Sequence, residues 1–138
     1  MYEVVFYENK PGFSELYNQI DKLKELSDKN KDARIQHRQI NKYINLLQEN
    51  GTYMDSNITK YLGDGIWELR PGNNRILYFF ANKQRYVLLH MFRKKSQKTP
   101  KAEIEKAKRE KDNYLKQEGN KRWLHGKITK NKPKTTVN

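Results

Sequence analysis

The sequence predicts an α+β fold: a four-stranded, mostly antiparallel sheet with two N-terminal helices and a C-terminal helix packed on one face. Three short apolar segments follow one another between residues 66 and 92 with turn residues between them, which is typical of two consecutive hairpins. On either side of them lie stretches whose apolar residues recur at helical spacing. With one more strand near the N-terminus, the expected order is β-α-α-β-β-β-α.

The N-terminal half is expected to hold the first strand and two antiparallel helices. Residues 2–8 are rich in Val, Tyr and Phe, which favours a strand, and Pro11-Gly12 would end it. Five apolar residues at helical spacing indicate the first helix: Phe13, Leu16, Tyr17, Ile20 and Leu23. Four more indicate the second: Ile40, Tyr43, Ile44 and Leu47. Asn50-Gly51 is a good C-terminal stop for that helix, and residues 52–63 are expected to be irregular.

The C-terminal half is expected to form the strand meander and the last helix. The three strands are predicted at Ile66–Arg70, Arg75–Phe80 and Arg85–Phe92. Thr99 is a suitable N-cap for a helix whose first residue is Pro100, and the helix would run to about residue 117, where Gly119 ends it. The domain is therefore expected to span residues 1–119. Residues 120–138, which hold six cations and no carboxylate, would be a basic C-terminal tail.

The charge of the chain favours a polyanionic partner. Lysine and arginine outnumber aspartate and glutamate by 29 to 16 in 138 residues, so the formal net charge is +13. The alternative is a solvated surface with a basic tail. The longest apolar run is about seven residues, too short to span a membrane, so no membrane partner is expected. The chain has no cysteine, which excludes disulfides and thiolate metal sites and agrees with a cytoplasmic protein. No histidine or carboxylate spacing typical of a metal site is present, so no cofactor is expected.

Closing the two hairpins on their turn residues predicts which side chains share a face of the sheet. The expected pairs are Glu68 with Leu77 and Arg75 with His90. One face would then carry Glu68, Arg70, Arg75, His90 and Phe92. The other, covered by helices, would carry Trp67, Leu69, Ile76, Tyr78, Val87, Leu89 and Met91.

The polar face ends in a dense group of cations, which lie just after the last strand: Arg93, Lys94, Lys95 and Lys98. One interpretation is that Glu68 neutralises the preceding arginines in a surface ion-pair ladder. Such a ladder contributes little to the stability of the fold. The other is that they grip phosphate, because a planar guanidinium matches phosphate oxygens. His90 is either a packed strand residue or, kept neutral by nearby cations, a general base.

Three strings in this region resemble a known family: residues 65–70 (GIWELR), 74–79 (NRILYF) and 88–100 (LLHMFRKKSQKTP). In this order and spacing they are similar to the phage-derived HigB-like toxins of the RelE/ParE superfamily. The resemblance implies a RelE-like fold and the toxin of a type II toxin–antitoxin pair. Such toxins cleave mRNA, usually in the ribosomal A site, and arrest translation. It also implies a helix-turn-helix antitoxin like HigA as partner, in a complex that can be a heterotetramer.

The face and the resemblance together give the candidate site. The candidate catalytic residues are Glu68, Arg70, Arg75, His90, Lys94 and Lys95. The candidate RNA-binding residues are Phe92, Arg93 and Lys98. Metal-free cleavage by the ribose 2′-OH would build negative charge on the phosphoryl oxygens, which these cations would stabilise. Arginine cannot act as a base, so the base remains Glu68, His90 or a lysine.

Two other functions remain open at this stage. A ParE-like relative would share the fold, poison DNA gyrase and cleave no RNA. A plain nucleic-acid-binding module would use the same cations with no chemistry.

Overall fold

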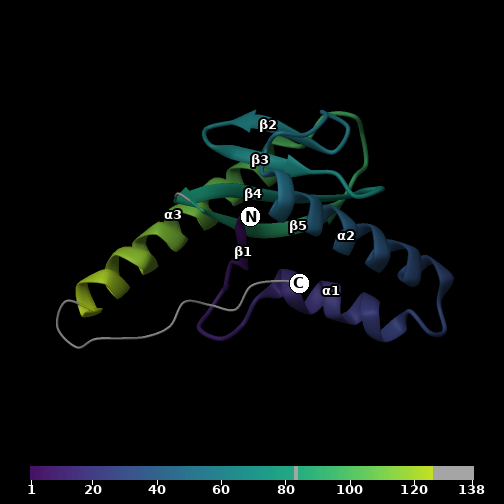
Figure 1. Ribbon diagram of the computed structural model, residues 1–138, viewed down its shortest axis with the longest axis horizontal. Coiled ribbons are helices and arrows are strands. Elements are labelled where there is room, and N and C mark those ends of the chain that lie inside the picture. The colour runs from purple at the N-terminus through teal and green to yellow at the C-terminus, as the bar shows by residue number, and fades with distance from the viewer. Residues whose placement is uncertain (83, 126–138) are drawn as a thin grey trace.

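The computed structural model, which describes residues 1–82 and 84–125 and the side chains up to residue 119, contains one five-stranded sheet and three helices. The elements are β1 (Glu3–Phe6), α1 (Glu15–Leu26), α2 (Lys31–Asn50), β2 (Thr59–Gly63), β3 (Ile66–Leu69), β4 (Asn74–Asn82), β5 (Arg85–Arg93) and α3 (Lys101–His125). The sheet order is β1-β5-β4-β3-β2, and β1 runs parallel to β5 while the other pairs are antiparallel (Figure 1). The α+β class and the order of the predicted elements are confirmed. No helix of the described residues is long and apolar enough to cross a membrane.

The fifth strand, β2, comes from the segment expected to be irregular. It pairs with β3 at the edge of the sheet, and a bulge between Tyr61 and Gly63 interrupts the pairing. The hydroxyl of Thr59, which is buried, donates to the Glu68 carbonyl over 2.9 Å and lies 2.5 Å from the Tyr78 hydroxyl. In this short edge strand, apolar and polar residues do not alternate clearly. The sequence pattern therefore did not indicate a strand here, and only four strands were predicted.

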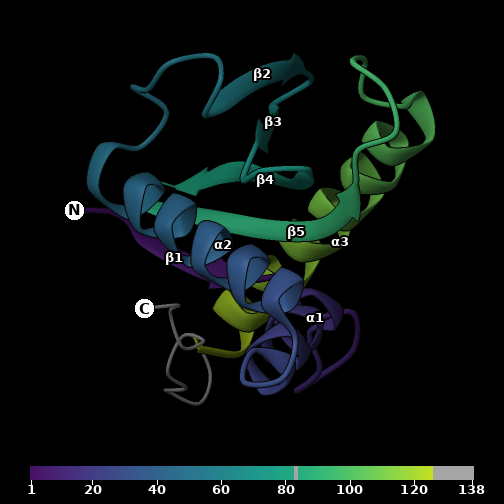
Figure 2. The same cartoon turned by 90° about the vertical axis from the view of Figure 1, so that its right-hand side faces the viewer.

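The helices cover both faces of the sheet rather than one (Figure 2). Helices α1 and α2 pack on one face, where the core includes Leu16, Ile40, Ile44, Leu47, Ile76, Tyr78 and Leu88. Helix α3 packs on the other face with Val5, Ile66, Leu77, Phe79, Val87, Leu89, Ala107 and Tyr114. Strands β4 and β5 are apolar on both sides, and such strands are stable only when both faces are covered. The prediction of helices on one face was therefore wrong.

The strand register agrees with the prediction in part. Glu68 pairs with Leu77 as expected, but His90 pairs with Leu77 and Phe92 with Arg75, which is a shift of two residues. Because side chains alternate with a period of two, this shift leaves Glu68, Arg75, His90 and Phe92 on one face. A bulge next to Leu77 then reverses the faces of β5. Trp67, Leu69, Ile76, Tyr78 and Met91 belong to the α1–α2 side as predicted, whereas Val87 and Leu89 pack on the α3 side.

The helix ends follow local capping chemistry, with one exception in α3. Ser14 and Asn30 cap α1 and α2, since their side chains accept hydrogen bonds from backbone N–H groups of the first turn. Helix α3 continues through Gly119 to residue 125, so the predicted end was wrong. An interior glycine costs a helix only about 1 kcal/mol, too little to end one flanked by good helix formers. Of the predicted tail, residues 126–138 lie outside the described residues.

Gly51 ends α2 as predicted, and its replacement is expected to be costly. Its φ is 63°, and a Cβ there would lie 2.8 Å from the Tyr2 ring and 2.9 Å from the Tyr86 hydroxyl. We expect Gly51→Ala to lower the free energy of unfolding by about 1–3 kcal/mol, measured by urea denaturation. Gly119→Ala is the matched control: it meets no neighbour and should be neutral or slightly stabilising. If Gly51→Ala and Gly119→Ala changed the free energy of unfolding equally, the positive φ and close contacts of Gly51 would not be the cause.

Candidate active site

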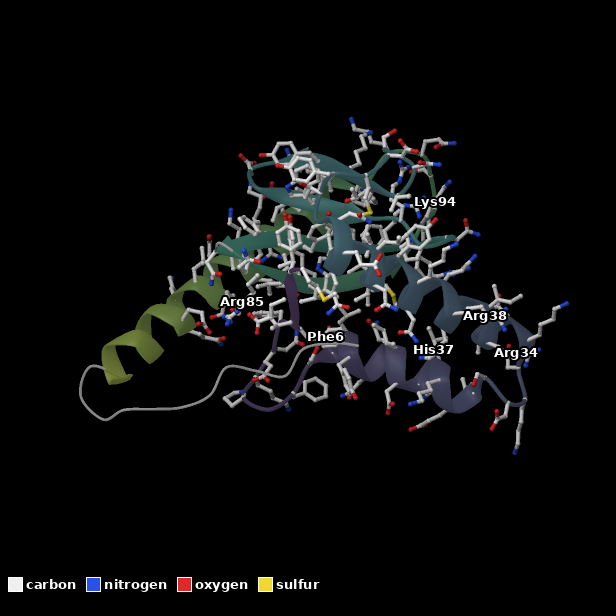
Figure 3. All side chains as sticks on the ribbon, viewed as in Figure 1. Phe6, Arg34, His37, Arg38, Arg85 and Lys94 are labelled. Carbon is white, nitrogen blue, oxygen red and sulfur yellow. The ribbon has the colours of Figure 1, made fainter. Side chains whose placement is uncertain are left out.

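A small pocket lies where β4 begins, β5 ends and the chain turns toward α3. It is lined by Arg75 from β4, Phe92 from β5 and residues 94–100. The backbone N–H of Lys94 donates to the Asn73 carbonyl over 2.8 Å, which fixes the start of this segment to the β3–β4 turn. Ser96 Oγ donates to the Lys98 carbonyl over 3.0 Å and folds the segment back on itself. Lys94 thus lies at the end of the sheet (Figure 3), held there by backbone bonds.

Arg75 forms one wall of the pocket and is almost completely buried. Its Nη1 donates to the carbonyls of Gly72 and Asn74, at 2.8 Å each, so one end of the guanidinium holds the preceding turn. Its Nη2 has no hydrogen-bond partner in the described part of the chain. Burial, and after it the charge of Arg70, lowers the pKa of Arg75, and Glu68 opposes that shift. Arginine stays protonated even so, which leaves a buried cation with one free donor edge.

Glu68 lies behind the pocket rather than in its wall. Its carboxylate is 2% exposed, and Oε2 is 3.4 Å from Arg70 Nε and 3.9 Å from Arg75 Nε. Its Oε1 accepts a short hydrogen bond from the Thr99 hydroxyl. Arg70 is further held by a bond of 2.8 Å from Nη1 to the Ser56 carbonyl. This arrangement is not a surface ion-pair ladder, because the carboxylate that joins the arginines is buried.

The cations at the end of β5 and just after it have no carboxylate partner in the described part of the chain. Among the described residues, the side chains of Arg93, Lys94, Lys95 and Lys98 form no ion pair. Arg85, at the other end of the same strand, makes a useful contrast, since it is bound by Glu3 at 2.8 Å and by Glu118 at 3.7 Å. Arg85 is therefore a structural cation. Of the four cations at and just after the end of β5, Lys94, Lys95 and Lys98 line the pocket and give it a positive charge that suits an anionic ligand.

His90 lies in a different environment from the one predicted. It was expected beside cations, but its Nδ1 is 2.6 Å from Glu110 Oε1 and its Nε2 is 2.9 Å from Glu103 Oε1. The ring is buried and does not line the pocket. The reason is that α3 covers this face of the sheet and brings both carboxylates onto the strand. His90 thus joins β5 to α3, and its contact toward the basic pocket is with the ring of Phe92, whose centroid lies 6.0 Å from its own.

Thr99 is the site residue that the sequence did not reveal. It lines the pocket and bonds Glu68, so it connects the segment before α3 to the sheet. It was predicted as a helix cap, but α3 begins at Lys101 and the Thr99 hydroxyl is directed to the carboxylate instead. Its only sequence signal was a hydroxyl next to Pro100. The described residues contain no group of three histidine or carboxylate side chains that could hold a metal ion.

The fold and the pocket define a class of protein: a small α+β domain that presents an unneutralised basic pocket at one end of its sheet. The model of the family described as phage-derived protein Gp49-like (DUF891) matches residues 21–112, which is more than half of the chain. The chain belongs to this Gp49-like family, which is a family of RelE/HigB-like toxins. No curated protein matches the chain.

Proposed function

We propose that this protein is the toxin of a type II toxin–antitoxin pair and that it is a ribosome-dependent mRNA endoribonuclease. The observation that carries the proposal is the pocket of Arg75, Lys94, Lys95 and Lys98: among the described residues, the one carboxylate paired with any of these side chains is the buried Glu68 behind Arg75. A pocket of this charge fits the phosphodiester of RNA. Family membership supports the toxin class.

The proposed reaction is metal-independent attack of the ribose 2′-OH on the adjacent phosphorus. The P–O5′ bond breaks, and the products are a 2′,3′-cyclic phosphate and a 5′-OH. Arg75 Nη2 and the lysine ammonium groups stabilise the charge that develops on the phosphoryl oxygens. Lys94 or Lys95 supplies the proton to the leaving 5′-oxygen, and a second basic side chain of the pocket takes the proton from the 2′-OH. Placement of message by the ribosome supplies the remaining orientation.

Glu68 serves in this scheme as a positioning residue, because it lies behind Arg75 and Thr99 and not against the RNA. We expect Glu68→Gln to slow cleavage by no more than about tenfold, since the introduced amide still accepts the Thr99 bond. The free energy of unfolding should fall by about 1–3 kcal/mol, because the two arginines lose a buried carboxylate. Single-turnover cleavage and urea denaturation measure these effects, with Glu105→Gln on α3 as the control. A loss of 10²–10⁴-fold in a stable Glu68→Gln protein would instead identify Glu68 as the general base.

The proposed partners follow from the same function. A helix-turn-helix antitoxin like HigA would hold the toxin inactive, in a complex that can be a heterotetramer. The protein would act in the cytoplasm, where ribosomes and message are found. The basic surface outside the pocket would contact ribosomal RNA. Lys101 is a candidate for that contact, whereas Lys108 is paired with Asp64 at 3.2 Å and with Glu105 at 3.3 Å.

Primer extension on mRNA, with and without ribosomes, tests the proposal. We expect cuts at fixed positions within codons, only when ribosomes are present, and cyclic-phosphate ends on the upstream fragments. Growth arrest with intact message and inhibited gyrase would identify a ParE-like toxin instead. Binding of RNA with neither cleavage nor arrest would leave a nucleic-acid-binding module.

A further inference from the structure

A second pocket lies beside the basic one. It is formed by α1, α2 and the part of the sheet where β4 begins and β5 ends. It encloses about 350 Å³, which is within the range of small-molecule sites, roughly 300–1,000 Å³. The apolar residues that line it are Leu23, Leu26, Met91 and Phe92. Phe92 also lines the basic pocket, so the two pockets share a wall. Whatever fills the second pocket is therefore adjacent to whatever occupies the first.

One buried polar side chain belongs to this second pocket. Asn74 is 2% exposed and lines it, next in sequence to Arg75. Its Nδ2 donates to Gln36 Oε1 over 3.0 Å, and Gln36 is itself held by a 2.6 Å bond from Nε2 to Asp32 Oδ2. No described residue donates to Asn74 Oδ1. Asn74 Oδ1 is not among the buried atoms that lack a partner, so it is an accessible, fixed acceptor to which a ligand can donate.

The rim of the second pocket is cationic. Lys22 of α1 and Arg93 of β5 both line it, and neither forms an ion pair with a described residue. Apolar walls, one unpaired acceptor and a positive rim match a nucleotide. Its base has apolar faces and N–H donors at its edge, and its phosphate carries the negative charge.

We propose that this second pocket binds the nucleobase of a nucleotide next to the scissile phosphate and that it contributes the base preference of cleavage. The inference rests on the proposed function, because it takes the basic pocket as the place of the scissile phosphate. An apolar side chain from a partner protein would leave Asn74 Oδ1 without a hydrogen bond. A carboxylate from a partner protein would place a second acceptor next to Asn74 Oδ1, and two acceptors repel each other. Both are unfavourable once the occupant covers Asn74 Oδ1 and excludes water from it, whereas a base edge supplies the missing donor.

The test compares two exposed leucines. Leu26, 44% exposed, lies at the second pocket, and Leu115, 40% exposed, lies on α3. Leu26→Glu and Leu115→Glu make the same change in charge, and thermal melting checks that both proteins fold. The probe is a short RNA with a 2′-deoxy group at the scissile nucleotide, which blocks cleavage. An abasic residue is placed in turn at each position near that nucleotide, and binding is measured by fluorescence anisotropy.

For the unmodified protein and for Leu115→Glu, an abasic residue at one position should weaken binding by about tenfold. For Leu26→Glu, the same abasic residue should have almost no effect. In parallel, the profile of cleavage on ribosome-bound message should lose its base preference in Leu26→Glu and keep it in Leu115→Glu. If the protein does not bind RNA in the absence of ribosomes, the cleavage profile alone tests whether the second pocket sets the base preference.

An unchanged abasic effect and an unchanged cleavage profile in Leu26→Glu would overturn the inference while the nuclease function stands. Loss of antitoxin binding in Leu26→Glu, with RNA recognition unchanged, would also overturn it and would mark the pocket as a protein-docking site. Absence of cleavage by the unmodified protein on ribosomes would instead reject the proposed function. These outcomes separate failure of the second pocket from failure of the nuclease.

Discussion

Lys94→Ala is expected to relieve growth arrest and to slow mRNA cleavage by about 10²–10³-fold, because one stabilising cation at the phosphate is removed. The free energy of unfolding should change by no more than about 0.5 kcal/mol. Its side chain makes no ion pair with a described residue, and the bond that fixes this position is donated by the backbone N–H, which alanine keeps. Primer extension after induction and urea denaturation measure the two effects.

Lys42→Ala is the matched control, since Lys42 is an exposed lysine on α2 away from the pocket. That variant should arrest growth as the unmodified toxin does. Arg75→Ala is a poorer test, because Arg75 also holds the carbonyls of Gly72 and Asn74 and its loss would disturb the turn. If Lys94→Ala cleaves message at the original rate, the pocket is not the catalytic site.

The largest expected effect on stability is that of His90→Leu. This change leaves the carboxylates of Glu103 and Glu110 without their common partner, and Glu110 is buried with its Oε2 already lacking a hydrogen bond. Removing one partner of a buried charged group costs about 3–5 kcal/mol. For a chain of this size, we expect the melting temperature to fall by about 10 °C or more. Differential scanning calorimetry measures the change.

His37→Leu is the control for that prediction, because His37 lies half-buried on α2 and its only side-chain hydrogen bond to a described residue is a long one of 3.4 Å, with Asn41. Its effect should remain within about 1 kcal/mol. The cleavage rate per folded molecule of His90→Leu should equal that of the unmodified protein. A stable His90→Leu protein with cleavage reduced more than a hundredfold would show that His90 is catalytic and that its contacts with α3 are secondary.

The face of the sheet that carries the site could be predicted from the sequence alone. Successive side chains of a strand point to opposite faces, so even a register shifted by two residues placed Glu68, Arg75 and Phe92 on one side. The group of cations after β5 was equally evident, because those residues are consecutive or nearly so. Turn residues, helical spacing and Gly51 determined the order of the elements, since these signals are local.

The roles within the site were decided by contacts between segments distant in the sequence. Helix α3 could pack on either face, and only the apolar surface of β4 and β5 directed it to the face that carries His90. That choice gave His90 two carboxylate partners from α3 and removed it from the pocket. It also brought Thr99 to Glu68, across 31 residues of chain.

The sequence by itself therefore determined the class of fold, which polar side chains share a face of the sheet and the cationic segment that follows β5. Only the tertiary structure decided which of those polar residues line the pocket and which lie behind it. The physical reason is that periodicity and turn chemistry act over a few residues, whereas burial and the pairing of charges depend on which distant segments meet.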